Sequence, residues 1–182
     1  GFLPGPLKFR LCIDMDNGDT VTLMDKQRIK RSLKRIAHQV SEDNRGAKEL
    51  VILGINERGY AVAELLREYL KDLSDKEIQC RQLIVDKKES SQTELSLKNK
   101  DVLLVDDVIF SGTTMFDALN QITRKHSPEE VHTATLIDRG HRKFPIFAQF
   151  VGLDLPTKLD EHVNVELQNS SPHCVVLEKS LH

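Results

Sequence analysis

Two adjacent carboxylates at the end of an apolar run constrain this chain more than any other feature of its sequence. Residues 102–105 read Val-Leu-Leu-Val, Asp106 and Asp107 follow, and residues 108–114 continue as Val-Ile-Phe-Ser-Gly-Thr-Thr. Apolar residues then recur at helical spacing across residues 116–122. A short, wholly apolar run is typical of a strand that is buried on both faces. The stretch therefore predicts a buried strand, a short loop and a helix.

The loop has the chemistry of a phosphate site. Ser111, Gly112, Thr113 and Thr114 offer backbone N–H groups, hydroxyls and a helix N-terminus. Two carboxylates would repel a phosphate, but they can accept hydrogen bonds from the hydroxyls of a sugar. We therefore expect residues 106–114 to bind a ribose 5-phosphate. The alternative is a structural strand end followed by an Asx-type helix cap.

Composition narrows the classes of protein that remain. At 182 residues the chain is expected to form one domain with a substantial core. A net charge of −2 gives no overall attraction to nucleic acid, so any such surface has to be local. Three widely separated cysteines suggest neither a metal site nor a disulfide framework, which fits a reducing compartment. Without a membrane-spanning run or a signal peptide, we expect a cytoplasmic protein with no membrane partner.

The N-terminal residues differ from the rest of the chain. Residues 1–6 have no hydrophobic period, and the chain does not begin with Met. We interpret residues 1–20 as an extension that is partly disordered or was added to the protein. Residues 21–182 are expected to form the single domain.

Apolar periodicity divides that domain into alternating helices and strands. One helix is predicted to start at Asp25, its N-cap, and to end at residues 44–46, and another spans residues 61–73. Strands are predicted over residues 50–55, 78–85, 131–137, 148–151, 163–167 and 174–177. The alternation predicts an α/β fold whose mostly parallel sheet carries helices on both faces. The last third is expected to add a small antiparallel C-terminal extension.

Three polar segments follow strands of the predicted sheet, namely residues 56–59, 106–114 and 138–142. Ligands of such sheets bind at the carboxyl ends of the strands, near the switch point of the strand order. Arg58 is predicted to meet a pyrophosphate there, with Gly59 allowing close backbone approach. The alternative for Arg58 is a surface position at a helix start, which the helix dipole disfavours for a cation.

Longer motifs carry a resemblance to a known family. Residues 136–146 read Leu-Ile-Asp-Arg-Gly-His-Arg-Lys-Phe-Pro-Ile, and residues 150–157 read Phe-Val-Gly-Leu-Asp-Leu-Pro-Thr. With residues 34–38, 54–59 and the carboxylate motif, they resemble the pyrimidine operon attenuator/uracil phosphoribosyltransferase family. The likeness extends over residues 22–178. It implies a type I phosphoribosyltransferase fold and Mg²⁺-dependent transfer of phosphoribosyl from 5-phosphoribosyl 1-pyrophosphate (PRPP) to a pyrimidine base. Uracil is the expected base, giving UMP and pyrophosphate.

The resemblance also implies roles for individual residues. Those expected to be catalytic are Asp106, Asp107 and Arg58. Those expected to hold the ribose and its 5-phosphate are Asp106, Asp107, Val108, Ser111, Gly112, Thr113 and Thr114, the two carboxylates acting directly or through Mg²⁺. Those expected to meet pyrophosphate are Asn56, Glu57, Arg58, Gly59, Lys87 and Lys88. Those expected to flank the base are Ile137, Asp138 and Arg139.

Some members of this family also bind messenger RNA, and the chain matches them only in part. The matching positions are Arg35, His38, His141 and Arg142. Phe147 and Leu153 stand where the RNA-binding members have basic residues. Losing two cations from a phosphate-reading surface weakens binding. RNA regulation is therefore the less favoured function.

Two further expectations concern the loop at residues 85–91 and the assembly. The loop is shorter than in the family, which puts the choice of base and the level of activity in question. A nucleotide-binding protein with little activity is thus a third alternative. Apolar residues at 144, 146 and 147 would suit an interface, and we expect a homodimer or a larger homo-oligomer.

Overall fold

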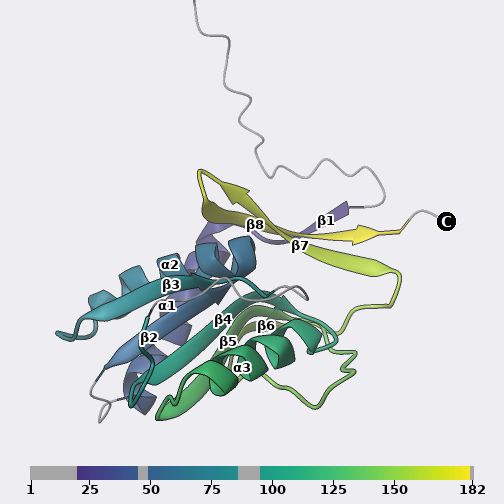
Figure 1. Cartoon of the computed structure of the whole chain (residues 1–182). Helices are drawn as coiled ribbons and strands as arrows, with labels where there is room; N and C mark the ends of the chain where they lie inside the picture. Colours follow the sequence, from purple (N-terminus) through teal and green to yellow (C-terminus); the bar gives the residue numbers. More distant parts are fainter. Residues whose placement is uncertain (1–19, 45–48, 86–94, 181–182) are drawn as a thin grey trace, which may run out of the picture.

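A five-stranded parallel sheet forms the centre of the molecule (Figure 1). The structure is a computed structural model and describes residues 20–44, 49–85 and 95–180. Lys87, Lys88 and all but the last residue of the expected N-terminal extension lie outside these ranges. The sheet has the order β3-β2-β4-β5-β6. Its strands are β2 (Leu50–Ile55), β3 (Ile78–Leu83), β4 (Asp101–Ile109), β5 (Glu130–Asp138) and β6 (Phe150–Asp154).

Helices cover both faces of this sheet, as predicted. On one face, α1 (Lys26–Asp43) and α2 (Asn56–Lys71) enclose the larger apolar cluster, and on the other α3 (Thr113–Lys125) encloses a second one. Asp25 caps α1 as expected, because its carboxylate accepts a hydrogen bond of 2.7 Å from the backbone N–H of Arg28. Each helix therefore buries its apolar side against one face of the sheet, and the sheet itself is buried on both faces.

A small antiparallel sheet lies beside the main one (Figure 1). It consists of β1 (Thr20–Met24), β8 (Ser171–Lys179) and β7 (Glu161–Gln168), in that order. Two details differ from the sequence prediction. The sheet includes the N-terminal strand β1, and β6 pairs in parallel with β5 instead of joining the antiparallel piece. No helical period marks the connection before β6, so the sequence did not reveal this crossover.

The boundaries of two elements also differ from the prediction. β4 continues through the carboxylate pair to Ile109, so Asp106 and Asp107 lie in the strand and not in a loop. α2 begins at Asn56, so residues 56–59 form its first turn. Asn56 has a φ of 55°, and Asn adopts this left-handed conformation more readily than most residues. This residue turns the chain directly from strand to helix. Within the described residues, no helix is long and apolar enough to cross a membrane.

Candidate active site

The carboxyl ends of β2 and β4 define the place where a ligand should bind. From β2 the chain passes through α2 to β3 on one side, while β4 leads to β5 on the other. This divergence is the switch point of an open α/β sheet, where ligands characteristically bind. The first turn of α2 and the connection from β4 to α3 meet at this edge. Two of the three predicted segments therefore lie side by side.

The two carboxylates differ in their surroundings. Asp106 is 6% exposed, and its Oδ1 atom accepts a hydrogen bond of 2.9 Å from the backbone N–H of Asp107. Burial, followed by the neighbouring charge of Asp107, raises the pKa of Asp106 well above its usual range. Asp107 is only half-buried, and its backbone oxygen accepts a bond from the Thr135 hydroxyl. Asp107 is therefore the carboxylate that a ligand can reach.

The phosphate loop has open donor groups. Gly112, with a φ of 80°, precedes α3 and gives it no side-chain cap, although the Ser111 hydroxyl accepts a bond of 3.3 Å from the backbone N–H of Thr113. The hydroxyls of Ser111 and Thr113 lie 2.9 Å apart, and Thr114 is exposed at the helix start. An uncapped helix N-terminus with adjacent hydroxyls can donate several hydrogen bonds to an anion. The arrangement has the chemistry of a phosphate cradle.

Two glycines seat the first turn of α2 against the strands. A Cβ atom on Gly54 would lie 2.3 Å from the Cα of Tyr60, and one on Gly59 would lie 2.8 Å from the backbone oxygen of Val105. Gly59 is buried, and its lack of a side chain lets this turn pack next to Asp106. The approach of a pyrophosphate to its backbone stays a prediction.

Arg58 connects the same turn to the small sheet. Its Nε atom donates a hydrogen bond of 3.0 Å to the backbone oxygen of Val165 in β7. The residue is otherwise exposed, as are Asn56 and Glu57 in the same turn. The Asn56 side chain accepts a bond of 3.0 Å from the backbone N–H of Val85. The described part of the predicted pyrophosphate set, residues 56–59, thus lies at the carboxyl edge of the sheet, where Asn56 and Arg58 hold neighbouring segments.

The connection between β5 and β6 supports the phosphate loop from outside. The backbone N–H of Lys143 donates to the backbone oxygen of Ser111 at 2.8 Å, and the ring of Phe144 stacks on that of Phe116 with centroids 4.8 Å apart. Arg142 donates to the backbone oxygen of Phe110 at 2.7 Å. These contacts fix the position of the loop relative to the sheet.

The residues expected to flank the base are mostly internal. Ile137 is fully buried in the larger apolar cluster. Asp138 forms an ion pair of 2.6 Å with Arg142. Arg139 is 6% exposed, and its guanidinium lies 4.3 Å from the centre of the Phe110 ring. Its Nε atom donates to the Thr157 hydroxyl at 2.9 Å, and Nη2 donates to the backbone oxygen of Glu161. The side chains of Ile137 and Arg139 therefore hold the fold together.

Sequence reasoning missed the contribution of Thr157 and Phe110 to this region. Thr157 is buried and contacts both Arg139 and the imidazole of His141. The Phe110 ring contacts both the Arg139 guanidinium and the His141 ring. Thr157 served only as a family marker in the sequence, since nothing local predicts its long-range partners.

The four possible RNA-contacting residues fall into two separate places. Arg35 and His38 are exposed on α1, where Arg35 donates to the backbone oxygens of Val151 and Gly152 at 3.0 and 2.7 Å. His141 and Arg142 lie in the connection after β5. The His141 ring contacts the backbone oxygen of Thr157, and Arg142 donates to the backbone oxygen of Ile146 and to the Asp138 carboxylate. Phe147 is 71% exposed beside them.

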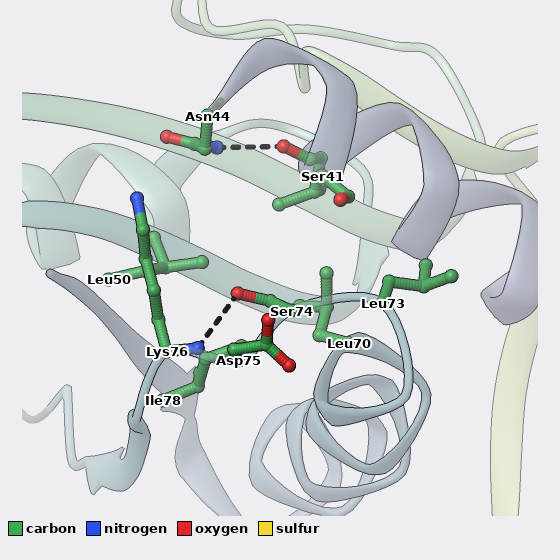
Figure 2. A pocket seen from close by; sticks show the side chains of 10 residues that line it. Ser41, Asn44, Leu50, Leu70, Leu73, Ser74, Asp75, Lys76 and Ile78 are labelled. Carbon is green, nitrogen blue, oxygen red and sulfur yellow. Dashed lines mark hydrogen bonds between the residues drawn. The ribbon is translucent and has the colours of Figure 1, made fainter. Parts of the chain in front are cut away.

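A separate cavity of about 310 Å³ lies at the opposite edge of the sheet (Figure 2). The ends of α1 and α2 and the starts of β2 and β3 form its walls, with Val40, Leu50, Leu70 and Ile78 among the lining residues. Because it opens at the amino ends of the strands, it takes no part in the site at Asp107.

The chain is similar to phosphoribosyltransferases in both sequence and fold. The phosphoribosyl transferase domain family matches residues 20–168. The hypoxanthine phosphoribosyltransferase of Trypanosoma cruzi has the same fold, with a TM-score of 0.74 and 17% identity over 87% of this chain and 95% of that chain.

The particular family follows from closer relatives. The bifunctional protein PyrR of Pediococcus pentosaceus is 35% identical over 170 residues, which is 85% of this chain and 96% of the relative. PyrR of Pelotomaculum thermopropionicum is 38% identical over 174 residues, or 86% and 94% of the two chains. The chain is therefore a type I phosphoribosyltransferase and belongs to the PyrR family.

Proposed function

We propose that this phosphoribosyltransferase transfers the phosphoribosyl group of PRPP to uracil, giving UMP and pyrophosphate. The observation that carries the proposal is the Asp106–Asp107 pair, which leads along β4 to the uncapped start of α3. Similarity to the PyrR proteins and the pyrimidine-family motifs of the sequence support uracil as the base. The cytoplasm is the compartment we propose with it.

The reaction needs positioning more than covalent work from the protein. Asp107 accepts hydrogen bonds from the ribose hydroxyls, and the start of α3 holds the 5-phosphate. The bond from the anomeric carbon to pyrophosphate breaks as the bond to the base nitrogen forms, and the base loses its proton. The ribose becomes oxocarbenium-like between these events, so nearby carboxylates favour the developing positive charge.

The donor atoms at the site suit Mg²⁺. Carboxylate oxygens are hard ligands of the kind Mg²⁺ prefers, and Asp107 is accessible while one oxygen of Asp106 is already engaged. Asp107 would therefore hold the ion indirectly, with either a hydroxyl of PRPP or a water molecule between the carboxylate and Mg²⁺. When bound, Mg²⁺ supplies charge stabilisation to the departing pyrophosphate.

PRPP titrations test the proposal directly. We expect calorimetry to show PRPP binding in the presence of Mg²⁺ and strong weakening when Mg²⁺ is chelated, because the pyrophosphate charge is then uncompensated. Equal affinity with and without the ion would contradict this use of the site.

Removing the hydroxyls of the phosphate cradle should weaken nucleotide binding. Thr113→Val with Thr114→Val keeps the size of both side chains and removes two donors to a charged group, each worth about 1.5–3 kcal/mol. UMP affinity measured by calorimetry should fall accordingly. Thr123→Val is the matched control, since its hydroxyl donates to the Leu119 backbone oxygen within α3. Undiminished UMP binding by the double variant would place the cradle elsewhere.

A second candidate function is the sensing of nucleotides by an RNA-binding regulator. The observation that favours it is the set of cations on the first helix, where Lys26, Arg28, Lys30, Arg31, Lys34 and Arg35 lie within three turns. Against it, Arg35 and Arg142 already donate to backbone oxygens, and the apolar Phe147 and Leu153 stand where the RNA-binding members have basic residues. We therefore propose regulation as the secondary function.

RNA binding at physiological salt is accordingly expected to be weak. Phe147→Arg should raise affinity for a pyrimidine-operon leader hairpin and steepen the logarithmic salt dependence by roughly 0.7–0.9, the contribution of one phosphate contact. Gel-shift titrations at two salt concentrations measure both quantities. Leu73→Arg is the control, because Leu73 is also an exposed apolar residue but follows α2 at the opposite edge of the sheet. Tight, sequence-specific binding by the unmodified protein would make regulation the primary function.

We also propose that the chain forms a homodimer or a larger homo-oligomer. The exposed ring of Phe147 next to the half-buried Ile146 gives an apolar area beside the phosphate loop. Covering such an area is a common reason for association.

A further inference from the structure

Three side chains that can bind a metal ion meet at the amino edge of the parallel sheet, opposite the active site. Asp101 is the first residue of β4 and pairs in register with Glu130, the first residue of β5. His132 lies two residues further along β5, on the same face as Glu130. One donor atom from each residue can be chosen so that all three lie within 4.8 Å of one another.

A chain of hydrogen bonds sets the proton on the His132 ring. The side-chain nitrogen of Gln149 donates to the Asp43 carboxylate at 3.1 Å, which leaves the Gln149 amide oxygen as the acceptor for His132. That oxygen lies 2.9 Å from Nδ1 of His132, so Nδ1 carries the proton and donates it. In the neutral ring, Nε2 then has a lone pair. Metal-binding histidines typically have such a partner on the other ring nitrogen.

Nε2 of His132 is buried beside the carboxylates without a hydrogen bond among the described residues. An oxygen of Glu130 is 3.2 Å away but makes no hydrogen bond with this nitrogen, so the contact is electrostatic only. Asp101 is 9% exposed, and its carboxylate belongs to the same cluster. The lone pairs of His132 and of two carboxylates therefore lie close together without a shared proton, and a cation bound among them would satisfy all three.

We propose that Asp101, Glu130 and His132 bind a divalent transition-metal ion of the Zn²⁺ class. One imidazole nitrogen and two carboxylate oxygens match the donors of Zn²⁺ sites with three protein ligands and a water. The nitrogen donor makes Mg²⁺ the poorer fit. The Glu130 side chain is 66% exposed and free to close on the ion. Bound there, the metal joins the first residues of β4 and β5.

This site is distinct from the proposed PRPP site. Asp101 and Asp106 lie on the same strand, five residues apart, which corresponds to roughly 17 Å. Zinc and magnesium can therefore be examined separately in one sample. The proposal does not depend on the substrate of the enzyme.

Zinc titration of the full chain in excess Mg²⁺ tests the proposal, because Mg²⁺ occupies the carboxylates at Asp107. We expect calorimetry to show one equivalent of Zn²⁺, at least tenfold weaker binding in Glu130→Gln and in Asp101→Asn, and a higher melting temperature with Zn²⁺ only in the parent. Glu129→Gln, an exposed neighbour, is the matched control and should bind like the parent. Because Glu130 is also exposed, its variant should fold.

The His132 ring provides a second, independent measurement. Nitrogen-15 NMR should show the proton on Nδ1 in the metal-free protein and a shift of the Nε2 resonance when Zn²⁺ is added. Zinc binding that is equal in the parent, Asp101→Asn and Glu130→Gln would overturn the proposal. So would a ring protonated on both nitrogens at pH 7 that takes up no Zn²⁺, since the cluster would then be an ordinary ion pair.

Discussion

Replacing Asp107 with Asn is expected to lower kcat/KM for PRPP by about 100-fold or more, with little change in the stability of the fold. The amide keeps the shape of the side chain but loses the negative charge. In the proposed reaction, the carboxylate accepts hydrogen bonds from two ribose hydroxyls and stabilises the positive charge that develops on the ribose. Hydrogen bonds to a charged group contribute about 1.5–3 kcal/mol each, and two such bonds give at least this factor. The side chain is half-buried and not part of either apolar cluster, so unfolding should be nearly unaffected.

The measurement is steady-state kinetics with PRPP varied at saturating base, together with urea unfolding of both proteins. Asp72→Asn serves as the control, because Asp72 is an exposed residue at the end of α2, at the far edge of the sheet. Parent-like kcat/KM in Asp107→Asn would remove this carboxylate from the reaction. A large loss of unfolding free energy would instead show a structural role.

Adding a single methyl group at Gly54 should destabilise the protein by about 3 kcal/mol or more. Its Cβ would lie 2.3 Å from the Cα and 2.7 Å from the N of Tyr60, and 2.8 Å from the backbone oxygen of Gly59. All three atoms belong to the backbone of α2, so no side chain can move aside. Overpacking against rigid neighbours typically costs 1–3 kcal/mol, occasionally more, and here a whole helix has to shift. The first turn of α2 would then leave its place beside Asp106.

Urea unfolding followed by circular dichroism measures the change in the free energy of unfolding. Gly140→Ala is the matched control, since a Cβ there meets nothing within 4 Å and only the φ of 76° opposes it. That strain should cost roughly 1–2 kcal/mol. A Gly54→Ala variant as stable as Gly140→Ala would show that α2 is not held as closely as the structure indicates.

Much of the fold and the centre of the site could be predicted because their signals are local. The apolar run before Asp106 and the helical spacing after Thr114 are set by burial on both faces of one sheet. The N-cap at Asp25 depends on a bond three residues away. Where neighbouring residues determine the structure, their order in the sequence is sufficient.

The remaining features depend on contacts between distant parts of the chain. Arg139 follows a strand end and was given a place beside the base only by the family resemblance, and its side chain is buried against Phe110 and bonded to Thr157, 18 residues away. Arg58 similarly reaches β7, 107 residues further along the chain. Neither partner has a local pattern that identifies it. The sequence predicts this helix only from residue 61, because the left-handed turn at Asn56 and the polar residues after it show no helical period.

The most direct test of the central claim is a phosphoribosyl transfer assay on the full chain. Purified protein with PRPP and Mg²⁺ is offered uracil, cytosine, adenine, hypoxanthine or no base, and the release of pyrophosphate and the nucleotide product are measured. We expect turnover with uracil, UMP as the product and dependence on Asp107. PRPP binding without turnover of any base, or preference for a purine, would contradict a uracil phosphoribosyltransferase.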